Sequence, residues 1–202
     1  MKANIIKFLY GGLAATLIIG CSSTSSNEEF SEDKMRSAYS YAYNSQGTLS
    51  HSDFRLIIRM EHLNYEWNMT TAHLAADMIN DSIEPVEWVR RSKPHLARAA
   101  VIVQYMIITS SQIDDRTTAA YAERLAKTNV QLLECWSELA WAMSNEDQEA
   151  CRRAGQKGSA LAQEKARAAL PIMRRLRDKL GAETTDAAIE AMIRDMIKRL
   201  GL

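Results

Sequence analysis

The chain has 202 residues and no net charge, with 25 basic and 25 acidic side chains. This balance excludes the strongly basic surface that general nucleic-acid binding requires. Eight glycines and three prolines leave long stretches in which apolar residues recur three and four apart, without an alternating strand pattern. The sequence therefore predicts an all-α protein, a single antiparallel bundle of about five or six helices after a flexible N-terminal tether.

Residues 1–20 have the layout of an export signal. Lys2 and Lys7 form a short positive region, and the residues from Phe8 to Ile19 are mostly apolar. This run is shorter than the about 20 residues that a membrane-spanning helix needs, and no basic stop-transfer cluster follows it. We therefore expect a signal peptide that is removed; the alternatives are a plain secretory signal and an uncleaved N-terminal helix.

The end of this signal carries a more specific motif, Leu17-Ile18-Ile19-Gly20-Cys21. It resembles the lipobox of bacterial lipoproteins, which implies that Cys21 receives a diacylglycerol and becomes the first mature residue. The resemblance covers only the leader. The residue after Cys21 is Ser22. An aspartate at that position would resemble a signal for retention in the inner membrane, so Ser22 implies sorting to the outer membrane. The domain is then expected to face the periplasm, with exposure at the cell surface as an alternative. Residues 21–30 are expected to form a flexible serine-rich tether.

Residues 31–202 are expected to form one helical domain. Helical periodicity predicts a short helix over residues 31–43, a turn over 44–49 and a long helix over 52–80. Residues 81–93 contain Pro85 and are expected to form a loop with one short helix.

The second half of the domain is predicted from its prolines, capping residues and glycines. Pro94 is expected to open a helix that ends near residue 112, since proline is tolerated in a first helical turn. Asp114 or Asp115 caps a helix that reaches residue 143, and Ser144 or Asn145 caps its successor. Glycines and Pro171 predict a break or a kink in that successor between residues 154 and 171. A last amphipathic helix is expected over residues 185–200, with Ala188, Ile189, Met192, Ile193, Met196 and Ile197 as its buried stripe.

Charge is unevenly distributed along the mature chain. Residues 21–151 carry 11 basic and 19 acidic side chains, whereas residues 152–202 carry 12 basic and 6 acidic ones. Oppositely charged helices lying side by side would explain this, as would a basic face for anionic lipid or for a partner. The candidates for partner binding are Trp88, Arg90, Arg91, Arg174, Arg175, Arg177 and Lys179.

Four potential metal ligands recur on the long second helix, namely His62, Glu66, His73 and Asp77. At about 100° per residue they fall within a sector of roughly 60° and can project along one stripe. However, the chain has no carboxylate three residues before a histidine, the spacing used by ferritin-like bundles, and Arg59 shares the stripe. A solvated, salt-bridged face is therefore the favoured interpretation over a metal site.

The tryptophans and methionines are interpreted mainly as core residues. Trp67 and Trp136 are expected in the core, whereas Trp88 is either core or exposed on the loop beside Arg90 and Arg91. A platform for envelope sugars is the alternative role of the tryptophans. The ten methionines fit irregular gaps in a helical core and can also line an adaptable docking groove.

Cys135 and Cys151 remain if Cys21 is acylated, and an oxidising compartment makes them candidates for a disulfide. If the chain reverses near residues 143–144, both lie at the same level of an antiparallel hairpin and can bond. If one helix continues instead, about 24 Å separates them and no bond can form. The hairpin is favoured because residues 145–149 lack apolar side chains and offer caps.

No motif predicts catalysis. The chain has no glycine-rich phosphate loop after a strand and no nucleophile elbow, so we expect neither an enzyme nor a cofactor. The sequence favours a non-catalytic protein-binding or assembly module of the cell envelope. The alternatives are a protective lipoprotein that blocks a toxin or an incoming component, and a metal-binding protein using the stripe of His62, Glu66, His73 and Asp77.

A Cys21→Ser substitution tests the predicted anchor, because serine cannot take the thioether-linked lipid. We expect lipid labelling of the chain to disappear and the protein to leave the membrane fraction. Cell fractionation with metabolic labelling by a fatty acid measures both effects. Recovery of the variant in membranes at the wild-type level would show that lipid on Cys21 is not the anchor.

Overall fold

The computed structural model describes residues 50–79 and 83–181, and residues 183, 186–188, 190, 191, 194, 195 and 198 beyond them. The predicted signal peptide, Cys21, the tether, the helix over 31–43 and the turn over 44–49 lie outside the described residues. Four long helices follow one another: α3 (His51–Ile79), α4 (Pro85–Ser111), α5 (Arg116–Ser144) and α6 (Gln148–Leu180). The described residues contain no strand.

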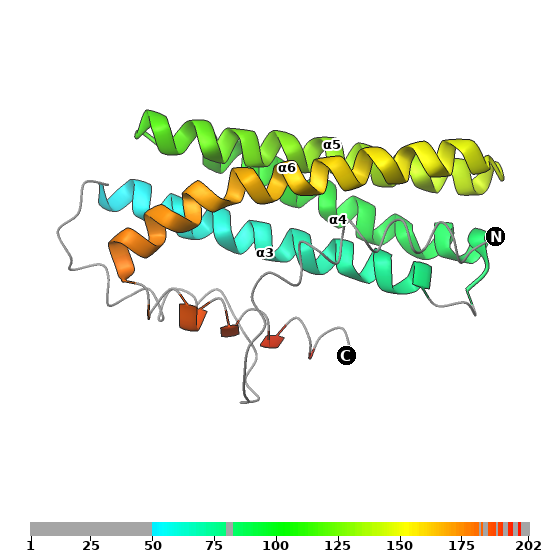
Figure 1. Ribbon diagram of the computed structural model, residues 1–202, viewed down its shortest axis with the longest axis horizontal. Helices are drawn as coiled ribbons and strands as arrows, with labels where there is room; N and C mark the ends of the chain where they lie inside the picture. The colour runs from blue at the N-terminus through cyan, green and yellow to red at the C-terminus, as the bar shows by residue number, and fades with distance from the viewer. Residues whose placement is uncertain are drawn as a thin grey trace.

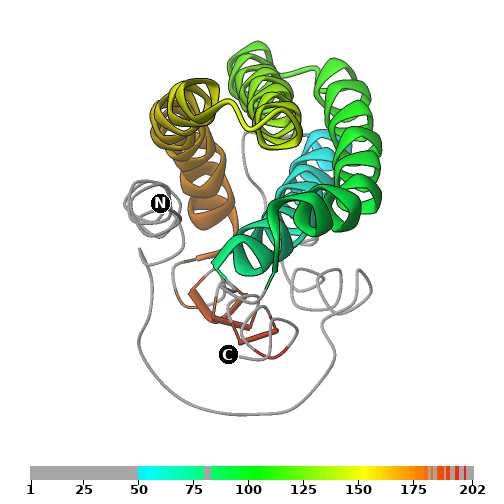
Figure 2. The ribbon, with the colours of Figure 1, turned by 90° about the vertical axis from the view of Figure 1, so that its right-hand side faces the viewer.

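The four helices form an antiparallel bundle, which confirms the all-α prediction (Figure 1). Seen end-on, α4 and α6 lie on opposite sides, with α3 and α5 between them (Figure 2). α4 packs along both α3 and α5, and α5 packs along α6. α6 starts beside α5 and crosses toward α3, so α3 and α6 approach each other only over a short stretch. The bundle therefore closes through a narrow α3–α6 seam.

The start of α3 is tied to the connection between α4 and α5. Ser50 Oγ accepts from the backbone N–H of Asp53 at 3.1 Å, so Ser50 is the N-cap of α3. The buried Asp53 carboxylate accepts from the backbone N–H groups of Asp114 at 2.8 Å and Asp115 at 3.1 Å. One carboxylate thereby holds two helix ends together, and α3 begins within one residue of its predicted start.

The proline assignment in α4 was wrong. Pro85, and not Pro94, occupies the first turn of α4, and the helix continues through Pro94. Proline inside a helix costs about 3 kcal/mol, because it removes one hydrogen bond and crowds the preceding turn. Burial of Trp88, whose removal would cost about 3–5 kcal/mol, offsets this cost and keeps the first turns of α4 helical.

The caps at the other turns confirm one prediction and correct another. Asp115 caps α5, its side chain accepting from the N–H of Thr118 at 2.9 Å. Asp147, rather than Ser144 or Asn145, caps α6 by accepting from the N–H of Ala150 at 2.9 Å. The connection turns sharply because Glu146 has a left-handed φ of 56°.

Of the two predicted alternatives, a break is absent from α6, because the helix runs continuously from Gln148 to Leu180, but its C-terminal part bends toward α3 (Figure 1). A side-chain Cβ at Gly158 would meet no neighbouring atom, so no close contact requires glycine at this partly buried helical position. Ile172 and Leu176, which follow Pro171, are completely buried. Their packing keeps the end of α6 helical despite the proline.

The C-terminal segment is described only at separate positions between residues 183 and 198, all of which are helical. Ala188 is buried, as its place in the predicted stripe requires. The other members of that stripe lie outside the described residues. Asp195 is also buried and accepts a hydrogen bond from the Tyr65 hydroxyl of α3.

Two clusters of buried side chains form the core. The larger one joins all four helices and includes Phe54, Ile57, Trp67, Met106, Leu125 and Ile172. The smaller one lies toward the α3–α4 and α5–α6 connections and includes Leu74, Trp88, Trp136, Leu139 and Cys151. The predicted core positions of Trp67 and Trp136 are therefore confirmed.

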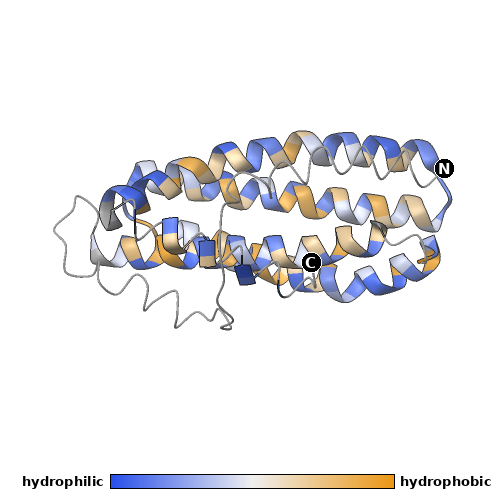
Figure 3. Cartoon of the chain, turned by 60° about the horizontal axis from the view of Figure 1, so that its bottom comes forward, coloured by the Kyte–Doolittle hydropathy of each residue, from blue (hydrophilic) through white to orange (hydrophobic). Residues whose placement is uncertain are grey.

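Polar and apolar residues are mixed along every helix (Figure 3). None of the helices among the described residues combines the length and the apolar character that crossing a membrane requires.

The disulfide between Cys135 and Cys151 is not formed, and both are buried free cysteines. The favoured hairpin is correct, but its turn lies at residues 145–147, later than expected. Cys135 therefore lies level with Ala154 and Gly158, and Cys151 lies nearer the turn beside Met143. Cys135 lies nine residues before the end of α5 and Cys151 three residues after the start of α6, so the two are offset by about 9 Å along the hairpin, which exceeds disulfide reach.

Thiol counting tests this correction. Denatured, unreduced protein should show two free thiols besides Cys21, and the native protein should react roughly tenfold more slowly, because burial protects both thiols and raises both pKa values. Mass spectrometry after alkylation measures both quantities. A chain that reacts at neither cysteine until a reductant is added would show that the bond exists.

Candidate functional site

The structure does not bring the predicted metal ligands together. His62, Glu66, His73 and Asp77 extend over about 22 Å of α3, and among the described residues no cluster could hold a metal ion. Glu66 forms an ion pair with Arg98 of α4, and the His73 ring stacks on that of His95 at 5.5 Å. These residues join α3 to α4, as the salt-bridged interpretation expects.

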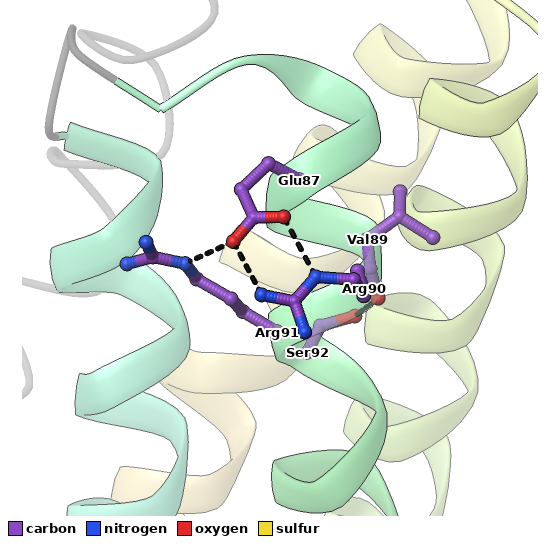
Figure 4. A network of polar contacts seen from close by, with 5 residues as sticks. All are labelled: Glu87, Val89, Arg90, Arg91 and Ser92. Atoms are coloured by element: carbon purple, nitrogen blue, oxygen red, sulfur yellow. Dashed lines mark hydrogen bonds and ion pairs between the residues drawn. The ribbon is translucent and has the colours of Figure 1, made fainter.

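The expectation that Trp88 is presented to a partner is wrong. Its side chain is 1% exposed, and its indole N–H donates to the backbone carbonyl of Leu74 at 3.0 Å. The neighbouring Arg90 and Arg91 are exposed, and both bind Glu87 at 2.7 Å (Figure 4). Trp88 therefore faces the core, whereas Arg90 and Arg91 meet at Glu87 on the surface.

The basic cluster of α6 is partly engaged within the domain. Arg175 pairs with Asp115 at 3.3 Å, which links α6 to the start of α5. Arg177 pairs with Asp186 of the C-terminal segment at 3.1 Å. Arg174 is exposed, and the side chain of Lys179 lies outside the described residues. Both pairs support the interpretation in which oppositely charged segments of one domain adjoin.

A cavity of about 480 Å³ lies at the end of the bundle where α3 joins α4 and α5 joins α6. We call it the end cavity. Its apolar wall is formed by Met78, Ile83, Pro85, Val86, Trp88, Leu139, Met143 and Cys151. Val86 is 76% exposed, which leaves an aliphatic side chain at the mouth. A volume of this size can hold a large apolar side chain of a partner.

A second hollow, the hairpin groove, runs along the outer side of the α5–α6 hairpin near the same end. Leu133, Trp141, Ala150 and Ala154 supply its apolar lining. Trp141 is 61% exposed, although Trp67, Trp88 and Trp136 are all buried. Exposed tryptophans are over-represented among the residues that contribute most to protein–protein binding.

Both hollows carry acidic side chains. Asp77, Glu84 and Glu146 line the end cavity, which has no lysine or arginine in its lining. Glu134 and Glu138 line the hairpin groove against a single cation, Arg153. This end of the bundle, the hairpin end, therefore combines apolar hollows with negative charge. It can accept an apolar side chain that has lysine or arginine beside it.

The sequence grouped Trp141 with the other tryptophans, for which a core position and a sugar platform were the alternatives, and did not predict it as a partner-binding residue. Five residues separate it from Trp136, which rotates it by about 140° from the buried stripe. That angle is available from the sequence and would have marked Trp141 as an outward-facing aromatic residue. The end cavity has no such signal, because residues of all four helices and of two connections create it.

A buried polar group occupies the α3–α6 seam. Glu61, Asn64, Tyr65 and Asn68 follow one side of α3 at positions one turn apart. Opposite them, Lys165 of α6 donates to Asn68 Oδ1 and lies 5.7 Å from the centre of the Trp67 ring. Glu61 is 4% exposed and Lys165 is 8% exposed. Two opposite charges are therefore enclosed where the bundle closes.

Burial shifts both charges toward their neutral forms. It raises the pKa of Glu61 to about 7, against the opposing effects of the Lys165 charge and the Asn64 hydrogen bond. It also lowers the pKa of Lys165 to about 7, against the attraction of Glu61. Perturbed groups of this kind occur at functional sites and in structural networks. Here Asn68 and Trp67 surround the ammonium, and the arrangement is structural.

No protein-family model matches the chain, and no curated protein and no solved structure is detectably similar to it. The function is therefore inferred from the side chains at the hairpin end, at the seam and on the outer helix faces.

The seam predicts an unusual pH dependence of stability. From pH 4.5 to 7 the unfolded chain loses the Glu61 proton while the folded chain keeps it, so this group lowers stability as pH rises. From pH 7 to 10.5 the unfolded chain keeps the Lys165 proton that the folded chain has lost, so stability rises again. The contribution of the pair is therefore least favourable near pH 7.

A Glu61→Gln/Lys165→Met variant should be more stable than the wild type by about 1–4 kcal/mol near pH 7, because it removes the cost of burying two charges. The advantage should shrink toward pH 4.5 and toward pH 10.5. Urea denaturation across this range measures it. In the matched control, Glu123→Gln/Lys127→Met at an exposed ion pair, stability should change by less than about 1 kcal/mol. A seam variant less stable than the wild type at pH 7 would refute the argument.

Proposed function

We propose that the protein is a non-catalytic helical lipoprotein that binds an envelope protein through its hairpin end. Cys21 anchors it to the outer membrane, and the domain faces the periplasm. The partner inserts a large apolar side chain, flanked by lysine or arginine, into the end cavity. The observation that carries this proposal is the combination of an apolar cavity, an exposed Trp141 and an excess of carboxylates at one end of the bundle.

The energetics favour such a partner. An apolar side chain of leucine size contributes about 1.5–3 kcal/mol when it is fully buried, and a tryptophan at an interface contributes at least as much. Carboxylates at the rim attract a basic segment and accelerate its association, but they add less to the affinity itself. Modest affinity is sufficient for a protein held at one membrane, because anchoring raises its local concentration.

The anchor and tether support the same role. A serine-rich segment at residues 21–30 cannot bury apolar surface and would act as a flexible spacer between lipid and domain. The metal-binding alternative receives no support from the separate positions of His62, Glu66, His73 and Asp77 along α3.

Site-specific photo-cross-linking in cells tests the proposal. A photoreactive amino acid is placed at Val86, at Trp141 or, as a control, at Gln163, which is exposed on α6 outside both hollows. We expect the first two positions to capture the same envelope protein and Gln163 to capture none. The cross-linked peptide of the partner should contain an apolar residue next to lysine or arginine.

Charge reversal supplies the second part of this experiment. Glu134→Lys/Glu146→Lys should lower the cross-linking yield about tenfold, because it converts attraction of a basic segment into repulsion. Asp114→Lys adds the same kind of charge at the opposite end of the bundle and should leave the yield unchanged. Equal capture at Gln163, or an undiminished yield after reversal at the hairpin end, would refute a binding site there.

A further inference from the structure

The outer side of α4 exposes an apolar stripe that no other described element covers. Val101, Tyr105 and Ile108 are each about half exposed, and their spacing of four and three residues aligns them along one side of the helix. The buried side of the same helix is formed by Ala99, Ile102, Val103 and Met106. α4 is therefore apolar on two opposite sides over its C-terminal half, although the bundle needs only one of them.

Basic side chains border this stripe. Arg59 of α3 lies over the Tyr105 ring, 5.8 Å from its centre, and Arg98 lies one helical turn before Val101. Arg90, Arg91 and Lys93 extend the positive charge toward the start of α4. These five cations are opposed by Glu66 and Glu87, the ion-pair partners of Arg98, Arg90 and Arg91, which leaves a net charge of plus three.

The stripe lies away from the hairpin groove. Ion pairing of Arg98 with Glu66 and stacking of Arg59 on Tyr105 show that the stripe belongs to the α3–α4 side of the bundle. The hairpin groove belongs to the α5–α6 side. Figure 2 shows that α4 and α6 lie across the bundle from each other. A flat surface could therefore rest on the stripe without covering the groove.

We infer that this face, defined by Val101, Tyr105 and Ile108 with Arg59 and Arg98, binds the surface of a bilayer containing anionic phospholipid. Aliphatic side chains with a tyrosine among them enter the boundary between headgroups and acyl chains, and arginines around them bind phosphate groups. The net positive charge favours anionic lipid over a neutral protein surface. This contact is additional to the proposed partner site and fixes the orientation of the domain on its membrane.

Protection of an introduced thiol tests the inference. Full-length Ile108→Cys protein is placed on vesicles of phosphatidylethanolamine and phosphatidylglycerol and treated with a bulky, membrane-impermeant maleimide. The native Cys135 and Cys151 are buried and give little background. Gln163→Cys is the matched control, an exposed position on α6. We expect modification at position 108 to slow about tenfold on these vesicles relative to vesicle-free protein, and modification at 163 to change less than about twofold.

Three results would overturn the inference. Equal rates at positions 108 and 163 would show that the face does not contact the bilayer. Equal protection on pure phosphatidylcholine vesicles would show that anionic lipid is not recognised. Protection that rises with protein concentration in the absence of vesicles would identify an interface between two copies of the chain. Loss of protection in Arg59→Glu/Arg98→Glu protein, whose helicity is checked by circular dichroism, would support lipid binding through charge.

Discussion

The enclosed ammonium of Lys165 determines how the bundle closes. Neighbouring helices α3 to α6 follow one another through short turns, but α6 meets α3 only over a short stretch. There, Asn68 Oδ1 accepts a hydrogen bond from Lys165, the Trp67 ring lies beside the Lys165 amine, and Glu61 supplies an opposite charge. An apolar contact would tolerate sliding by a turn, whereas a buried donor requires its acceptor at one position. We expect this requirement to favour one register between α6 and α3.

Around this closed core, the outward-facing apolar side chains divide into two sets with different electrostatic surroundings. Trp141 and Val86 lie among carboxylates, whereas Val101, Tyr105 and Ile108 lie among arginines. A neutral chain therefore carries two surfaces of opposite sign, which total charge conceals. The acidic surface attracts a basic protein segment and repels anionic lipid, and the basic surface does the reverse. One small domain can therefore discriminate between these two contacts.

The sequence predicted those features that a single helix determines. Apolar spacing placed α3 within a residue of its limits, Asp115 signalled the start of α5, and Trp67 was assigned to the core. Features that depend on packing between helices were missed. Pro85 and Pro94 both suit a first turn, and only burial of Trp88 decides between them. The position of Cys151 relative to Cys135 depends on where the hairpin turns, and the end cavity depends on four helices at once.

Pro94 divides α4 into two parts that differ in how readily they unfold locally. It has no N–H to donate to the Arg90 carbonyl, so the hydrogen-bond ladder is interrupted between residues 85–93 and the remainder of the helix. The first part depends on Trp88 as its buried attachment, and it also supplies Pro85, Val86 and Trp88 to the wall of the end cavity. We therefore expect these two turns to open more readily than the rest of α4, which would change the width of the cavity mouth while the four-helix core stays folded.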